Sequence, residues 1–64
     1  MIELTRLNDR KIVINCDLIE SVEETPDTVI TITTGHKYIV KESADTIVGE
    51  VVRYKKKIFT NFME

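Results

Sequence analysis

The sequence is poor in residues that cross-link chains or bind metal ions. Among 64 residues there is one cysteine, Cys16, one histidine, His36, and no tryptophan. A single cysteine excludes an internal disulfide framework, and one histidine with no second thiol nearby excludes a zinc knuckle. Cys16 is therefore expected to be a buried, reduced side chain, and His36 an exposed turn residue.

Long apolar runs are also absent. No stretch approaches the ~20 apolar residues that a membrane-spanning helix needs. The first residues, Met1-Ile2-Glu3-Leu4, lack the basic and apolar regions of a signal peptide. The net charge of -2 gives no long-range attraction to nucleic acid or to an anionic membrane. These features predict a soluble, cytoplasmic protein without a transmembrane segment.

Motifs for catalysis or cofactor binding are missing as well. Gly35 and Gly49 stand alone, so there is no glycine-rich phosphate loop. Glu20, Glu23 and Glu24 lie along one segment, whereas acid/base pairs and hard-cation sites need carboxylates that converge from several directions. The sequence predicts no catalytic residue, no cofactor and no metal, and hence a protein that is not an enzyme.

The length fixes the domain organisation. A chain of 64 residues forms one domain, here residues 1–64. A domain of this size buries only about 60% of the surface that its unfolded chain exposes. Self-association is one way to strengthen such a small core, so a homo-oligomer is expected.

Alternation of apolar and polar side chains predicts strands through the first forty residues. The turn residues Asn8, Asp9 and Gly35 tolerate positive φ, and Pro26-Asp27 favours a turn. The five strands are expected as an antiparallel meander at Ile2–Thr5, Lys11–Asn15, Leu18–Glu24, Thr28–Thr33 and Lys37–Val40.

After residue 40 the apolar period becomes that of a helix. Ser43 is suited to cap a helix, and Asp45 lies where a carboxylate favours the positive end of the helix dipole. One apolar face recurs at spacings of four, three and four, formed by Ile47, Val51, Tyr54 and Ile58. The expected fold is α+β, with a five-stranded meander over about residues 2–40, a helix over about 44–59 and a short tail at 60–64.

Both faces of the predicted sheet carry apolar side chains. Ile30 and Val29 point to opposite faces, as do Val40 and Ile39. One helix covers only one face, so the other must be covered in a different way. Either the strands curl into an SH3-like roll or a second subunit packs there, and the pattern leaves both open.

A basic and aromatic segment near the end of the helix is the candidate binding site. Its candidate residues are Tyr54, Lys55, Lys56, Lys57, Phe59 and Phe62. Basic and aromatic interleaving is typical of surfaces that bind RNA, anionic membranes or acidic proteins. The competing interpretation is a solvated helix end whose aromatic side chains face the core.

Several short motifs together resemble the FlbD/SwrD family of flagellar accessory proteins. They include Leu4-Thr5-Arg6-Leu7-Asn8, Thr25-Pro26-Asp27-Thr28 and, at a characteristic distance, Val40-Lys41-Glu42-Ser43. The resemblance runs from Met1 to about Ile58. It departs from the family at Asn8-Asp9, where Asn-Gly is common, which changes the turn type and leaves the topology unchanged.

The resemblance implies a small cytoplasmic protein that supports swarming motility through the power of the flagellar motor. It implies a protein partner at the motor or among its regulators, with a location at the cytoplasmic side of the flagellar base. No catalytic or ligand-binding residue is attached to the shared motifs. An RNA-binding regulator that uses the basic helix end is the alternative function, although nucleic acid is the less favoured partner.

Overall fold

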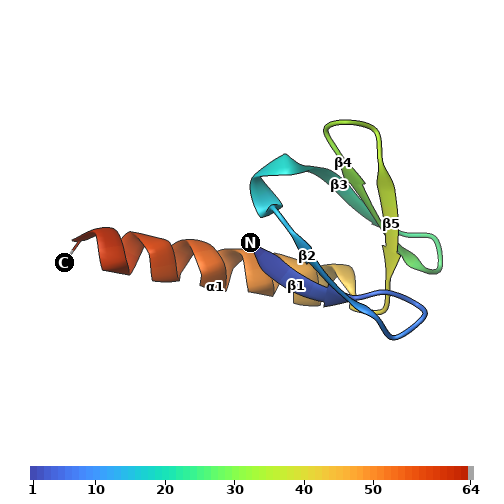
Figure 1. The fold of residues 1–64 in the computed structure, drawn as a ribbon, viewed down its shortest axis with the longest axis horizontal. Helices are drawn as coiled ribbons and strands as arrows, with labels where there is room; N and C mark the ends of the chain where they lie inside the picture. Colours follow the sequence, from blue (N-terminus) through green and yellow to red (C-terminus); the bar gives the residue numbers. More distant parts are fainter. Residues whose placement is uncertain (64) are drawn as a thin grey trace.

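Five β-strands precede one long α-helix in the computed structural model, which describes the backbone of residues 1–63 and the side chains of residues 1–59 (Figure 1). The elements are β1 (Ile2–Thr5), β2 (Lys11–Ile14), η1 (Cys16–Leu18, a 3-10 helix), β3 (Ile19–Glu24), β4 (Thr28–Ile32), β5 (Lys37–Val40) and α1 (Ala44–Met63). The predicted α+β class and the order of strands before the helix are confirmed.

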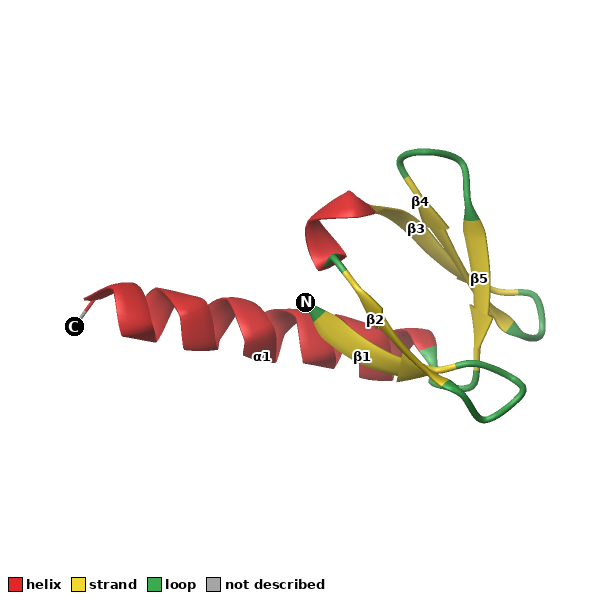
Figure 2. Ribbon diagram, in the orientation of Figure 1, coloured by secondary structure: helices red, strands yellow, loops and turns green. Residues whose placement is uncertain are grey.

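The strands form two antiparallel sheets, β1-β2 and β3-β4-β5, and not the single meander that the sequence predicts. The break lies at η1, which turns the chain between β2 and β3 (Figure 2). Asn15 opens this turn, because its side-chain oxygen accepts the Asp17 N–H at 3.0 Å. Strand pairing therefore stops after β2 and resumes only at Ile19.

A contact between β1 and β5 joins the two sheets. Arg6 and Val40 form an isolated antiparallel bridge, and the Lys41 N–H donates to the Thr5 carbonyl at 2.8 Å. The strand order through this bridge is β3-β4-β5-β1-β2, with no ladder between β3 and β2. Both sheets thereby face one shared core.

The turns form as the sequence predicts. Asp9 adopts φ 68°, and the Asn8 side chain accepts the Arg10 N–H at 3.0 Å within the β1–β2 connection. Gly35 adopts φ 91° between β4 and β5, a conformation that costs glycine little because it has no Cβ. Both hairpins are confirmed.

The core lies between the two sheets and the first half of α1. Its buried apolar side chains are Ile2, Leu4, Ile14, Cys16, Ile30, Val40 and Ile47. Ile39 and Val29 are cross-strand partners on the outer face of their sheet, where Ile39 is exposed and Val29 is half-buried. The predicted division of β4 and β5 into two faces is thus correct, and only the inner face is fully covered within one chain.

The first turn of α1 is capped from two sides. The Ser43 hydroxyl accepts the Thr46 N–H at 3.2 Å, which confirms the predicted cap. Glu24, at the end of β3, accepts the Ala44 N–H at 2.6 Å and places a carboxylate at the positive end of the helix. These bonds fix where the helix leaves the sheets.

The helix ends at Met63, four residues beyond the expected end at residue 59. The predicted tail at 60–64 is wrong for the backbone of residues 60–63, where the helix continues through Thr60 and Asn61. Threonine and asparagine are only mild helix breakers, and neither glycine nor proline follows them. The helix therefore continues through most of the segment predicted as a tail.

Candidate protein-binding surface

The second half of α1 projects beyond the strands (Figure 1). Tyr54 is half-buried and packs against the core. This agrees with the interpretation in which the aromatic side chains near the helix end face the core. Phe59, in contrast, is 64% exposed, so only part of the aromatic pattern faces the core. The projecting half of the helix presents a large apolar side chain to solvent.

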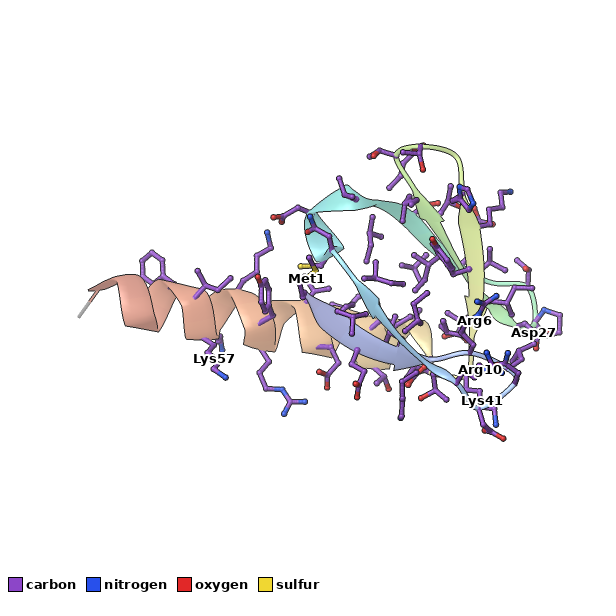
Figure 3. All side chains as sticks on the ribbon, in the orientation of Figure 1. Met1, Arg6, Arg10, Asp27, Lys41 and Lys57 are labelled. Carbon is purple, nitrogen blue, oxygen red and sulfur yellow. The ribbon has the colours of Figure 1, made fainter. Side chains whose placement is uncertain are left out.

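The three lysines between these aromatics are exposed. They point in different directions, because successive helical residues are about 100° apart. Lys57 extends from the helix on the side away from the strands (Figure 3). The sixth candidate, Phe62, has a side chain that lies outside the described residues.

Two parallel rows of side chains run along α1. The inner row is the predicted face, Ile47, Val51, Tyr54 and Ile58, of which the first three contact the core. The outer row is Val48, Val52, Lys55 and Phe59, which has the same spacing of four, three and four, shifted by one residue. Val48 is 58% exposed and Val52 is 46% exposed. The apolar arc of α1 is therefore wider than the part of the helix that the strands of the same chain cover.

Shallow hollows border the outer row. One of about 480 Å³ is lined by Val51, Val52, Lys55, Lys56 and Phe59. A second, of about 370 Å³, is lined by Asp17, Tyr54, Lys55, Ile58 and Phe59. Because Lys55 and Phe59 border both hollows, they form a ridge between them. We call the outer row with these two hollows the helix surface.

Lys55 is anchored by an ion pair. Its ammonium donates to the Asp17 carboxylate at 2.7 Å. This hydrogen bond and the charge of Lys55 hold the pKa of the Asp17 carboxyl below its usual value of 3.8, and the same contact raises the pKa of Lys55. Both side chains remain largely exposed, Lys55 at 58% and Asp17 at 66%, so this is a surface ion pair that links α1 to η1.

The candidate residues predicted from sequence cover half of the helix surface. Val48, Val52 and Ile58 are also exposed, although the basic and aromatic pattern does not predict them as binding residues. One signal in the sequence could have identified Val48 and Val52. It is the four, three, four spacing of the outer row, which repeats the spacing of the core face one residue later. Ile58 was assigned to the core face, yet it lies beyond the strands and remains 47% exposed.

Gly49 lies on the exposed side of α1, and a Cβ built there would meet nothing within 4 Å. We expect Gly49→Ala to raise the free energy of unfolding by about 0.5–1 kcal/mol, since alanine is the better helix former. Urea unfolding at low micromolar concentration, followed by circular dichroism, measures this. Gly35→Ala is the control and should destabilise, because Gly35 needs φ 91°. A decrease in the free energy of unfolding for Gly49→Ala would show that the space around this residue is not open as described.

Other chemically reactive residues are dispersed. Cys16 is buried, and the His36 ring is exposed and stacks on Tyr38 with centroids 6.0 Å apart. Within the described part of the chain, no three His, Cys, Asp or Glu side chains come together as metal ligands would. The search of the described helices also finds none that is long and apolar enough to cross a membrane.

Comparison with known proteins gives one match. A family model described as FlbD, flagellar and swarming motility proteins, matches residues 1–59. The matched range contains all five strands and α1 as far as Phe59, and thus the helix surface. No curated protein and no solved structure matches. The family match confirms the resemblance seen in the sequence motifs.

Proposed function

Because this chain belongs to the FlbD family of flagellar and swarming motility proteins, we propose that it is a non-enzymatic accessory protein of the flagellum. It acts in the cytoplasm, at the base of the flagellum, and supports the power of the motor. It does so through contacts with other proteins. The family match supplies the link to motility, and the contact mechanism is our proposal.

The helix surface is the observation that carries this proposal. Exposed apolar side chains next to cations are typical of protein-binding sites, in which a few large anchors supply most of the affinity. Phe59 is the largest exposed apolar side chain among the residues whose side chains the structure describes, and Lys56 lines the same hollow and adds positive charge beside it. We assign partner binding to Tyr54, Lys55, Lys56, Lys57, Phe59 and Phe62, as well as Val48 and Val52.

An RNA-binding regulator is less well supported by the same residues. Single-stranded RNA needs exposed aromatic rings for stacking and free cations for phosphates. Tyr54 is half-buried, and the ammonium of Lys55 is held by Asp17. Salt dependence distinguishes the two functions, because phosphate contacts weaken steeply as salt rises and apolar contacts do not.

Deletion of the gene in its host tests the proposal. We expect tethered cells to rotate with reduced torque under load while the number of flagella per cell stays normal. Expression of the wild-type chain should restore torque, whereas Phe59→Asp should not, because a carboxylate replaces the apolar anchor.

Val13→Asp is the matched control, since Val13 is 61% exposed on β2 and lines neither hollow of the helix surface. It should restore torque like the wild type. Unchanged torque with an altered number of flagella would instead favour a regulatory role. Full rescue by Phe59→Asp would place the contact elsewhere on the molecule.

A further inference from the structure

A second cationic region lies at the end of the molecule opposite to the projecting half of α1. The nine lysine and arginine residues fall into two groups, and only one group belongs to α1. The other group lies on the β1–β2 hairpin, on β5 and directly after β5, and consists of Arg6, Arg10, Lys11, Lys37 and Lys41. Figure 3 shows three of these residues, Arg6, Arg10 and Lys41, at the end of the molecule away from Lys57. This region is separate from the helix surface.

A hollow of about 310 Å³ opens within this cationic region. It shares no residue with the two hollows of the helix surface, and its lining residues are Arg6, Leu7, Asn8, Lys37 and Ile39. The bridge between Arg6 and Val40 brings the end of β1 beside β5. Lys37 and Ile39 are two residues apart on β5, so they point to the same face of the sheet. We call this hollow with its five lining residues the hairpin surface.

Hydrogen-bond donors predominate among the polar side chains of the hairpin surface. Arg6 and Lys37 are cations, and no acidic residue lines the hollow. Neither cation forms an ion pair with another residue that the structure describes. The Asn8 side-chain oxygen accepts the Arg10 N–H at 3.0 Å, so the amide nitrogen of Asn8 remains to donate to a ligand. Two cations and an amide donor around one hollow favour a ligand with carboxylates or other anionic groups.

The other acidic side chains at this end of the molecule leave the two cations uncompensated. Asp9 forms an ion pair with Lys41, and the carboxylate of Glu42 accepts a backbone N–H of β1. Asp27 lies at the same end of the molecule (Figure 3), and Glu23 lies on the adjoining sheet, but neither lines the hollow. The positive charge of the hairpin surface is therefore available to an acidic partner.

Apolar side chains give the hairpin surface a second means of recognition. Leu7 is 49% exposed and Ile39 is 43% exposed, and both line the same hollow as the cations. Val29, the cross-strand partner of Ile39, is half-buried and extends this apolar area onto β4. A small anion would leave these side chains in water. A ligand that also has an apolar side chain would cover them, as the apolar centre of a protein interface does.

From these observations we propose that the hairpin surface binds an acidic segment of a partner protein, in which carboxylates flank one large apolar side chain. The guanidinium of Arg6 can hold a carboxylate through two parallel hydrogen bonds, and the apolar side chain contacts Leu7 and Ile39. RNA fits the hollow less well, because no aromatic side chain lines it for base stacking. The inference goes beyond the proposed function, because it adds a second contact at the end of the chain opposite to the helix surface.

Titration of the isotope-labelled chain with a synthetic peptide tests the inference. The peptide has glutamates on both sides of a central leucine. In NMR spectra at physiological salt, we expect saturable shifts of the backbone amide signals of residues 6–8 and 37–39, complete at about 1 mM peptide or less. A peptide with glutamine in place of glutamate should bind about tenfold more weakly or worse. Shifts confined to residues 54–59, or no saturation, would overturn the inference.

A pair of arginine variants tests whether binding depends on the hollow. Arg6→Gln should raise the dissociation constant of the acidic peptide about tenfold, because it removes one of the two cations of the hollow. Arg10→Gln makes the same chemical change in the same hairpin, at an exposed arginine that does not line the hollow. It should change the constant by no more than about twofold at physiological salt. Equal losses for the two variants would show that binding follows the overall charge, and would overturn the inference.

Phosphate ligands are tested with the same variants. Oligouridine and vesicles that contain an anionic phospholipid are the two probes, and both should bind more weakly than the acidic peptide. Tighter binding of either probe than of the peptide, with a loss for Arg6→Gln and none for Arg10→Gln, would assign the hollow to RNA or to lipid headgroups. That result would overturn the assignment to an acidic protein segment.

Motility separates this inference from the proposed function. Failure of the peptide to bind, together with failure of Phe59→Asp to restore torque, would refute the inference and leave the motor function. Binding of the peptide at the hairpin surface, together with unchanged torque after deletion of the gene, would refute the motor function and leave the inference. The two results are independent, because one is measured on purified protein and the other in cells.

Discussion

Ile47→Ala is expected to lower the free energy of unfolding by about 2–5 kcal/mol. Ile47 is 1% exposed and is the fully buried residue through which α1 joins the core. A domain of this length has a total stability of roughly 3–10 kcal/mol, so the variant is expected to be largely unfolded or close to it. Urea unfolding followed by circular dichroism, at a concentration where the chain is monomeric, measures the loss.

Val48→Ala is the control, one position along the same helix. Val48 is 58% exposed, so its truncation should change the stability of the monomer by no more than about 0.5 kcal/mol. The contrast tests which row of α1 faces the core. Similar losses for both variants would show that the helix is rotated from the orientation described above.

Local patterns were sufficient to predict most of the secondary structure. The β-branched run in β4, the positive φ at Asp9 and Gly35, and the Ser43 cap each depend on residues within a few positions of one another. Such interactions are visible in the sequence because their physical cause is local. The succession of five strands along the chain and the start of the helix could be predicted for this reason.

The split into two sheets could not be predicted in this way. Alternation identifies strands but does not say which strands pair, and the turn at η1 is built around Asn15, whose side chain accepts the Asp17 N–H and whose carbonyl accepts the Leu18 N–H. The bridge from Arg6 to Val40 joins residues far apart in sequence. Long-range pairing of this kind leaves no periodic signal in either segment.

The sequence predicts only part of the helix surface, for a related reason. The lysines and Phe59 are recognisable by residue type, whereas Val48 and Val52 resemble core residues in composition. Their exposure depends on which side of the helix faces the sheets, since the neighbouring Ile47 is 1% exposed. The sequence places Glu24 with Glu20 and Glu23 along one segment, and the cap that Glu24 forms on Ala44 is visible only in the folded arrangement.

Glu42 holds the two sheets together, and its removal is the second large effect that we expect. Both oxygens of its carboxylate accept the Thr5 N–H, at 2.9 and 3.0 Å. The carbonyl of Thr5 accepts the Lys41 N–H at the same junction. Glu42→Ala removes a charged acceptor from a partly buried N–H, which should lower the free energy of unfolding by about 1.5–3 kcal/mol at pH 7.

The effect of Glu42→Ala should depend on pH. Burial alone would raise the pKa of the Glu42 carboxyl, but the hydrogen bonds from Thr5 outweigh it and bring the pKa below its usual value of 4.5. A carboxyl with a lowered pKa in the folded state contributes stability that is present above its usual pKa and is lost as the pH falls through the folded value. The difference between wild type and variant should therefore shrink in acid.

Urea unfolding of wild type and Glu42→Ala at pH 7 and at pH 3 measures this difference. Glu23→Ala is the matched control, because Glu23 is an exposed carboxylate on β3 and its loss should change stability by no more than about 0.5 kcal/mol at either pH. A loss for Glu42→Ala that is equally large at both pH values would show that packing, and not the charged acceptor, holds β1 against β5. That result would also remove the acid sensitivity that we expect at the junction between the two sheets.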